Sequence, residues 1–157
     1  MMSAQDPKKT STHLTPDMVG FRLLKLTNLL SRPFFGKFAK QYALNLNEWR
    51  AMVVIANSPG VASQDISAAT GLNPMTISRA IGGLRRAQRI REEVDPDNHR
   101  RILIWLTDKG LETYELISPY SERQAKMLLE VLSPEEVQAL SKITDKLVRQ
   151  AESIINE

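Results

Sequence analysis

The segment that most constrains the fold is residues 71–86, where one helix is expected to end and another to begin. Gly71 is able to take the left-handed backbone conformation that closes a helix. Asn73 and Pro74 form a typical helix start, with a capping side chain and a proline at the first helical position. Apolar residues then recur every three or four positions, at Ile77, Ala80, Ile81 and Leu84. The pattern predicts two helices joined by a tight turn, with one face of the second helix buried.

The opposite face of this second helix carries Met75 beside hydroxyl and basic side chains, which are Thr76, Ser78, Arg79 and Arg86. Residues 66–91 contain no acidic residue, and five arginines fall there: Arg79, Arg85, Arg86, Arg89 and Arg91. A short helix, a turn and a second helix with a basic outer face are what major-groove binding requires. An acid-free, arginine-bearing surface also suits a phosphate backbone. We therefore predict a DNA-recognition helix over residues 74–86.

After this helix the sequence changes to a pattern typical of strands. Residues 90–94 and 101–106 are short, β-rich runs, separated by turn-forming residues at 95–99. The tip of the predicted hairpin carries His99, Arg100 and Arg101. A helix-turn-helix followed by such a hairpin is a winged helix-turn-helix. Arg100 suits a narrow, A·T-rich minor groove, and for both arginines the alternative is a solvated hairpin tip.

The helices before the turn are predicted from their caps. Asn47 is expected to cap a helix that ends at the Ser-Pro-Gly sequence of residues 58–60, and Ser63 to cap a short helix through Thr70. Backbone N–H groups at Ser63 and Gln64 are then placed to meet a phosphate. The candidate DNA contacts are Ser63, Gln64, Asn73, Pro74, Met75, Thr76, Ser78, Arg79, Arg86, His99, Arg100 and Arg101.

The N-terminal helix is expected to begin at residues 15–17, Thr-Pro-Asp. Its apolar residues continue from Val19 to Phe38 and cover more than one side of a helix. Pro33 is expected to kink the helix or split it near residues 31–32. We favour a helix that also packs against a second subunit, the alternative being a helix buried within its own monomer.

The C-terminal part predicts two more helices. Thr107 caps the first, which passes Tyr114 and meets Pro119, and Ser133 and Glu136 have the spacing of a capping box for the second. That last helix repeats apolar residues close to a heptad seam: Val137, Leu140, Ile143 or Thr144, Leu147, Ala151 and Ile154. A homodimer formed by the two ends of the chain is therefore expected.

The 157 residues suffice for a single globular domain, mainly α with a small β-hairpin wing. We expect a disordered lead-in over 1–14, an N-terminal dimerisation helix over 15–46, the winged helix-turn-helix DNA-binding region over 47–107, and C-terminal dimerisation helices over 108–157. Lys and Arg outnumber Asp and Glu by 7 to 2 in residues 1–47 and by 8 to 6 in 48–107, whereas acids lead by 10 to 6 in 108–157. The basic part therefore lies upstream of the acidic end.

Several classes of site are not expected. The chain has no cysteine, which excludes disulfides and thiolate sites. His99 lies near Asp95 and Asp97, but the spacing of a calcium loop is absent, so neither a metal nor a cofactor is expected. The sequence contains no His-Glu-x-x-His site, no phosphate-binding glycine loop and no Gly-x-Ser-x-Gly motif, and no apolar run approaches a membrane span. We expect a cytoplasmic protein that is not an enzyme. A small enzyme or a protein-binding adaptor on the same scaffold is the alternative.

From Thr15 onward the chain resembles the MarR family of bacterial regulators. The most specific match is the run DPDNHRRILIWLTDKG at residues 95–110, which resembles the wing of that family, and residues 72–84 match its recognition helix. One departure is Asn98, which stands where the family usually has an aspartate that orients the wing arginine, Arg100. Either Asp97 takes over that role from one position earlier, or Arg100 is held more loosely.

The resemblance implies a dimeric transcriptional regulator, usually a repressor, that binds a pseudo-palindromic operator. It also implies release by a small, often aromatic or phenolic effector bound between the dimer helices and the winged region. Arg22 is a candidate partner for an anionic effector, solvent exposure being the alternative. Trp49 and Met52 are candidate pocket residues, with a place in the core as the alternative.

Overall fold

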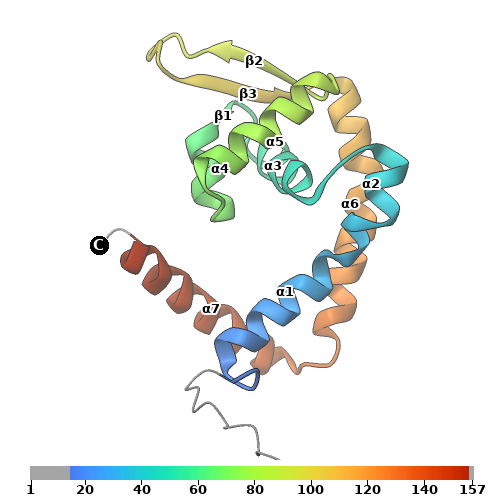
Figure 1. The fold of residues 1–157 in the computed structure, drawn as a ribbon, viewed down its shortest axis with the longest axis vertical. Coiled ribbons are helices and arrows are strands. Elements are labelled where there is room, and N and C mark those ends of the chain that lie inside the picture. The colour runs from blue at the N-terminus through green and yellow to red at the C-terminus, as the bar shows by residue number, and fades with distance from the viewer. Residues whose placement is uncertain (1–14, 156–157) are drawn as a thin grey trace, which may run out of the picture.

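The computed structural model describes residues 15–155 (Figure 1). Its elements, in chain order, are α1 (Val19–Phe35), α2 (Lys37–Tyr42), α3 (Leu46–Asn57), β1 (Val61–Ala62), α4 (Ser63–Thr70), α5 (Pro74–Arg86), β2 (Ile90–Val94), β3 (Ile102–Leu106), α6 (Asp108–Leu129) and α7 (Pro134–Ile155). The predicted fold class, mainly helical with a small β wing, is confirmed. The lead-in expected over 1–14 lies outside the described residues.

The helix-turn-helix is built as the sequence predicts. Gly71 ends α4 with a φ of 69°, a conformation that costs glycine little. The Asn73 side chain then accepts a hydrogen bond from the Thr76 N–H at 2.9 Å, and Pro74 opens α5. The inner face of α5 is buried through Ile77, Ala80, Ile81 and Leu84.

The wing belongs to a three-stranded antiparallel sheet of order β1-β3-β2. Ile104 is paired with Glu92 on β2 and with Val61 on β1, so β3 is the central strand. The hairpin is confirmed, with β3 beginning at Ile102 rather than at residue 101. The sequence did not predict β1, because a two-residue strand carries no period of its own.

The core lies where α3, α4, α5 and α6 meet the sheet. Met52, Ile55 and Ile66 have no exposed surface, and neither has Leu84 of α5. Helices α3 and α5 approach closely at Gly83, where an added Cβ would lie 1.9 Å from Oε1 of Glu48. A larger residue at this position would require the end of the Glu48 side chain to move.

Four expected helix boundaries are wrong by a few residues. The N-terminal helix, expected to begin at residues 15–17, begins at Val19. Asn45, not Asn47, caps α3, because Asn45 and Glu48 have the reciprocal spacing of a capping box. Ala62 precedes α4 where Ser63 was expected as the cap, and its N–H donates to Asp65. Helix α1 is not split near residues 31–32, since it continues to Phe35 and the break falls at the non-helical Gly36.

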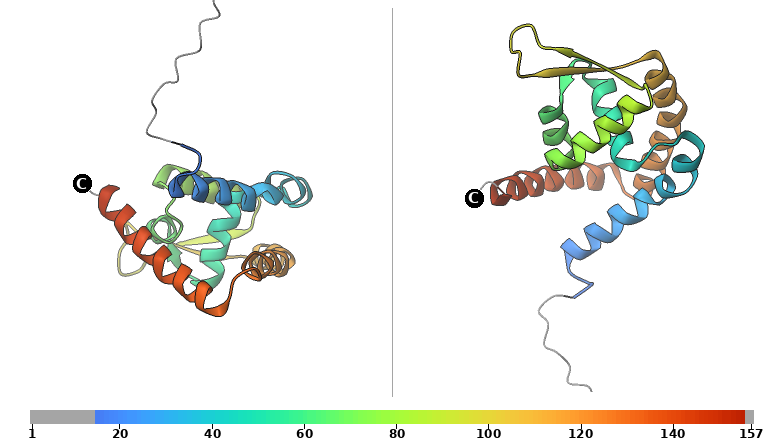
Figure 2. Two further views of the ribbon diagram at one scale, coloured as in Figure 1. Left: turned by 90° about the horizontal axis from the view of Figure 1, so that it is seen from below. Right: turned by 45° about the horizontal axis from the view of Figure 1, so that its top comes forward.

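The two end helices leave apolar surface open. No residue of α7 is buried, and its apolar stripe, including Leu140, Ile143 and Leu147, is exposed. Phe21 is 55% and Leu24 64% exposed on α1, so the alternative of a helix buried within its own monomer is wrong. The wing lies at one end of the molecule and α1 lies towards the other (Figures 1 and 2). No helix within residues 15–155 is both long enough and apolar enough to span a membrane.

Candidate nucleic-acid interface

The outer face of α5 presents side chains that are free to meet a ligand. Met75, Ser78, Arg79 and Arg86 are exposed and Thr76 is half-buried. Within residues 15–155, neither the Arg79 nor the Arg86 guanidinium has an ion-pair or hydrogen-bond partner. The outer face therefore offers hydroxyl groups and unpaired cations along one helix, as a major-groove surface requires.

The other three arginines of the acid-free segment are already engaged, so they add no free guanidinium group to the arginine-bearing surface. Arg91 pairs with Glu93, and its guanidinium lies 4.4 Å from the centre of the Trp105 ring. Arg89 is only 7% exposed and donates hydrogen bonds to the backbone carbonyls of Tyr42 and Ala43, at the end of α2. It ties the end of the recognition helix to α2 and is not available to DNA.

Arg85 makes a two-pronged ion pair from α5 to β2. Its Nε lies 2.5 Å and its Nη2 2.8 Å from the carboxylate oxygens of Glu92. The hydrogen bonds from Arg85 lower the pKa of Glu92, and the same bonds raise the pKa of Arg85. The pair fixes the recognition helix against the wing, and it holds the Arg85 charge close to a carboxylate.

The beginning of α4 faces the same groove as α5. Ser63 and Gln64 are exposed at the first turn of α4. A groove of about 440 Å³ runs between α4, α5 and the wing, and its polar lining consists of Ser63, Gln64, Ser67, Ser78, Arg85 and Glu92. The structure therefore brings the predicted phosphate-contacting residues of α4 next to the predicted reading face of α5.

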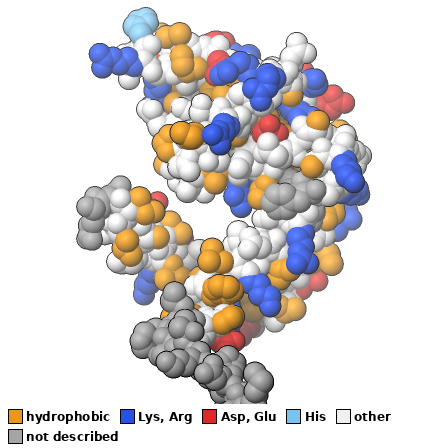
Figure 3. Space-filling view, viewed as in Figure 1, with side chains coloured by type: hydrophobic (Ala, Val, Ile, Leu, Met, Phe, Trp, Pro, Cys, Tyr) orange, Lys and Arg blue, Asp and Glu red, His pale blue; other side chains and the backbone are white. Residues whose placement is uncertain are grey.

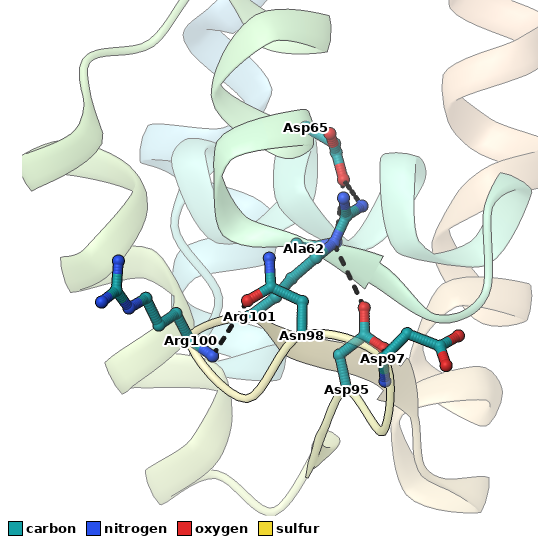
Figure 4. Close-up of polar contacts among 7 residues, drawn as sticks. All are labelled: Ala62, Asp65, Asp95, Asp97, Asn98, Arg100 and Arg101. Atoms are coloured by element: carbon teal, nitrogen blue, oxygen red, sulfur yellow. Dashed lines mark hydrogen bonds and ion pairs between the residues drawn. The ribbon is translucent and has the colours of Figure 1, made fainter.

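The two arginines at the tip of the wing, Arg100 and Arg101, point in opposite directions (Figure 4). Arg100 points away from the protein, and its side chain has no partner among the described residues. Arg101 points back towards α4, where its Nη2 lies 2.5 Å from Oδ2 of Asp65. His99 is exposed beside Arg100. Lys and Arg side chains gather over this end of the molecule (Figure 3).

Asn98 orders the backbone of the tip and not the guanidinium beside it. Its Oδ1 accepts a hydrogen bond from the Arg100 backbone N–H at 3.2 Å. The Asp97 carboxylate points away from Arg100 (Figure 4), so it does not take over the role of the missing aspartate. Of the two alternatives left open by the sequence, the structure agrees with a more loosely held Arg100.

A second, mainly apolar cavity of about 410 Å³ lies between α1, α3 and α6. Trp49 lines it, as predicted for a ligand pocket, but Met52 does not, because it is fully buried in the core. Arg22 is exposed on α1 and is not among the lining residues. Among the described residues, the cation that lines this cavity is Arg50.

Residues from α6 complete this cavity, and the sequence analysis did not single them out. Tyr120 and Ser121 line one side, and the Ser121 hydroxyl is buried without a hydrogen-bond partner among the described residues. Their only sequence signal is their position next to Pro119, inside a helix that continues through that proline. Within residues 15–155, no three potential metal-ligating side chains gather in one place.

These features define a winged helix-turn-helix protein with long helices at both ends. No protein-family model and no curated protein sequence matches the chain. Solved structures do. A MarR/EmrR family transcriptional regulator from Acinetobacter sp. ADP1 is 25% identical, with a TM-score of 0.76, over 84% of this chain and 93% of its own.

Two further structures share the fold at lower identity. MepR of S. aureus, solved with DNA, is 18% identical with a TM-score of 0.75 and covers 85% of this chain and 98% of its own. PcaV from Streptomyces coelicolor, solved with its natural ligand, is 21% identical with a TM-score of 0.69, over 96% of this chain and 99% of its own. The chain has the fold of the MarR-family transcriptional regulators, which confirms the resemblance found in the sequence.

Proposed function

We propose that this chain is a transcriptional regulator that binds DNA as a homodimer and responds to a small effector. The observation that carries the proposal is the set of unpaired guanidinium groups on the recognition helix and the wing tip, Arg79, Arg86 and Arg100. Arg89, by contrast, is buried and donates hydrogen bonds to backbone carbonyls, so its role is structural. Unpaired, exposed cations on a helix-turn-helix are available to phosphates and base edges.

The geometry supports a definite docking mode. Helix α5 enters the major groove, with Thr76, Ser78 and Arg79 at base edges or phosphates. The first turn of α4, at Ser63 and Gln64, faces a phosphate with its backbone N–H groups. Arg100 reaches the adjacent minor groove.

A homodimer follows from the open apolar stripes of α1 and α7. Leu140, Ile143 and Leu147 repeat along one side of α7, and their exposure in the single chain is 43%, 53% and 49%. Burial of such a stripe against a second copy removes apolar surface from water. A two-fold dimer then binds a pseudo-palindromic operator, with half-sites about one turn of the duplex apart.

The cavity between α1, α3 and α6 is our candidate for the effector site. Its apolar walls suit an aromatic ring, and Arg50 suits a carboxylate or phenolate. The buried, unpartnered hydroxyl of Ser121 offers a further polar contact. We propose a small aromatic acid or phenol as the effector and repression as the mode of action. Since α1 and α3 both line the cavity, a ligand bound there would contact an end helix and a helix of the DNA-binding region at the same time.

The direct test is selection of bound duplexes from a random-sequence pool by the full-length protein, followed by a mobility shift over a range of salt concentrations. We expect a pseudo-palindromic sequence to be enriched and its affinity to fall steeply with salt, through release of counterions from several phosphates. A pool in which no sequence is enriched would contradict the proposal. The alternative functions, a small enzyme or a protein-binding adaptor, would then remain. A thermal-shift screen with aromatic acids and phenols then tests the effector site, because a ligand of the native state raises its stability.

A further inference from the structure

The two neighbouring arginines of the wing are oriented in opposite directions. Arg100 extends outward, whereas Arg101 lies between carboxylates of two different elements, Asp65 of α4 and Asp95 at the base of the tip (Figure 4). Because Arg100 points away from the carboxylates that hold Arg101, the two guanidinium groups are not placed to enter one groove together. One of these arginines therefore has a role other than contact with DNA.

Arg101 is held from two sides. Its Nη2 lies 2.5 Å from Oδ2 of Asp65, and its Nε lies 4.0 Å from Oδ2 of Asp95. That Nε is buried and has no hydrogen-bond partner among the described residues. The Arg101 side chain is 35% exposed and that of Asp95 only 17%, so the guanidinium is partly withdrawn from water.

The backbone of Arg101 closes the tip loop. Its C=O accepts from the Asp95 N–H at 2.9 Å, and its N–H donates to the Asn98 C=O at 2.8 Å. Whatever fixes the Arg101 side chain therefore also fixes the loop that carries Arg100.

Asp65 links this loop to the start of α4. Its Oδ2 accepts from the Ala62 N–H at 3.2 Å and also receives the Arg101 guanidinium. One carboxylate thus serves as part of the cap of α4 and as the anchor of the wing. The wing tip and the phosphate-facing end of α4 are fastened together through this oxygen.

We propose that Arg101 is a positioning residue that aims the wing, and that Arg100 makes the contact with DNA. The role in DNA binding rests on the proposed function, but the contacts that join Arg101 to Asp65 and Asp95 exist in the free protein. Exposed ion pairs add little stability, and the consequence of this pair is orientation. With Arg101 in place, the backbone of the tip is fixed, and Arg100 projects from a defined position although its side chain has no partner among the described residues.

Double-mutant analysis separates positioning from direct contact. We expect Arg100→Ala to weaken binding to the selected duplex. The plot of log affinity against log salt concentration should also become less steep, by about the slope that one phosphate contact contributes. Arg101→Ala should weaken binding in the wild-type background but add almost nothing to Arg100→Ala, because the two residues act through one contact. If the fold-losses in affinity of the two single variants multiply in the double variant, Arg101 itself contacts DNA, and the proposal is overturned.

A pair of charge-matched variants gives a second test. Asp65→Asn keeps an oxygen for the Ala62 N–H but loses the ion pair, whereas Asp97→Asn removes a wing charge that does not touch Arg101. If Arg101 positions the wing, Asp97→Asn strengthens DNA binding through reduced repulsion and Asp65→Asn binds more weakly than Asp97→Asn. If Arg101 contacts phosphate, freeing it makes Asp65→Asn the tighter binder, and the proposal fails.

Hydrogen exchange of the DNA-free protein makes the test independent of the proposed function. We expect Arg101→Ala and Asp65→Asn to speed exchange of the Asp95 and Arg101 amides by about tenfold or more, while Arg100→Ala leaves them unchanged. Equal exchange in all variants would overturn the linkage. If no duplex is selected but exchange changes as stated, the proposed function fails and the structural link between wing and α4 stands.

Discussion

Helices α5 and α7 have almost the same sequence pattern and opposite surroundings. Each repeats apolar residues every three or four positions. In α5 the stripe is buried, with Leu84 at 0% exposure, whereas in α7 the stripe is open, with Leu147 at 49%. An amphipathic pattern therefore predicts that one face of a helix will be covered, but it does not indicate which part of the protein or which partner covers it. For α5 the cover is α3, α4 and the sheet, and for α7 we infer a second copy of the chain.

The largest effect should come from a charge placed in the open stripe. Leu147→Asp would bury a carboxylate in an apolar interface and should cost at least about 3 kcal/mol of association free energy. Sedimentation should then show monomers at concentrations where the wild type is dimeric. Gln138→Asp, on the opposite face of α7, is the control and should leave the dimer intact. A dimer that survives Leu147→Asp would rule α7 out as the interface.

A pair of leucine truncations sharpens the contrast between the two helices. Leu84→Ala removes side-chain volume from the closed core and should lower the free energy of unfolding by about 2–5 kcal/mol. Because Leu84 has no exposed surface in the single chain, this loss should not vary with protein concentration. Leu140→Ala in α7 should destabilise only through the dimer, so its effect should depend on concentration. Urea unfolding at two protein concentrations measures the loss of stability in both variants. If the two losses depend on concentration in the same way, the proposed difference between the buried and the dimer-covered helix is contradicted.

On the recognition helix, the informative contrast is between a free arginine and a paired one. Arg79→Ala should cost about 1–3 kcal/mol of discrimination at its base pair, if it contacts a base edge. Arg85→Ala is the matched control, because its guanidinium already pairs with Glu92, and it should change discrimination little. Competition binding with operator variants measures both. A larger loss for Arg85 than for Arg79 would reverse the assignment.

The smallest effect concerns the Arg85–Glu92 pair. Arg85 is 58% exposed, so solvent screens the pair, and Glu92→Gln should cost no more than about 1 kcal/mol of stability at neutral pH. The fold lowers the pKa of Glu92 below its ordinary value of 4.5. Its contribution is therefore fully present above that value and is lost as pH falls through the lowered pKa. The difference between wild type and variant should shrink on acidification in urea unfolding, and a constant difference would contradict this assignment.

Local chemistry explains what the sequence predicted well. The turn between α4 and α5 depends on Gly71, Asn73 and Pro74, each of which acts on its own backbone, so it was predictable without knowledge of the rest of the fold. The same holds for the box at Ser133 and Glu136, whose two hydrogen bonds are both present. Caps fail as predictors where two candidates stand close together, as Asn45 and Asn47 do.

What the sequence could not give are partners distant along the chain. Arg89 was counted among the surface arginines, but it donates to carbonyls some 46 and 47 residues earlier. Arg101 was expected at the groove and pairs with Asp65, 36 residues away. Nothing in a stretch of arginines indicates which of them the fold will neutralise. The cavity has the same difficulty, since Arg50 and Tyr120 meet only when α3 and α6 pack.

The central claim is that the closed helix-turn-helix reads DNA while the open ends pair two copies. The most direct test is to measure the mass of the complex with the selected duplex together with its hydroxyl-radical footprint. The account predicts two chains on one duplex and two protected patches about one helical turn apart, related by the two-fold symmetry of the site. A single chain bound to one asymmetric patch, or a complex that forms equally well with Leu147→Asp, would contradict it.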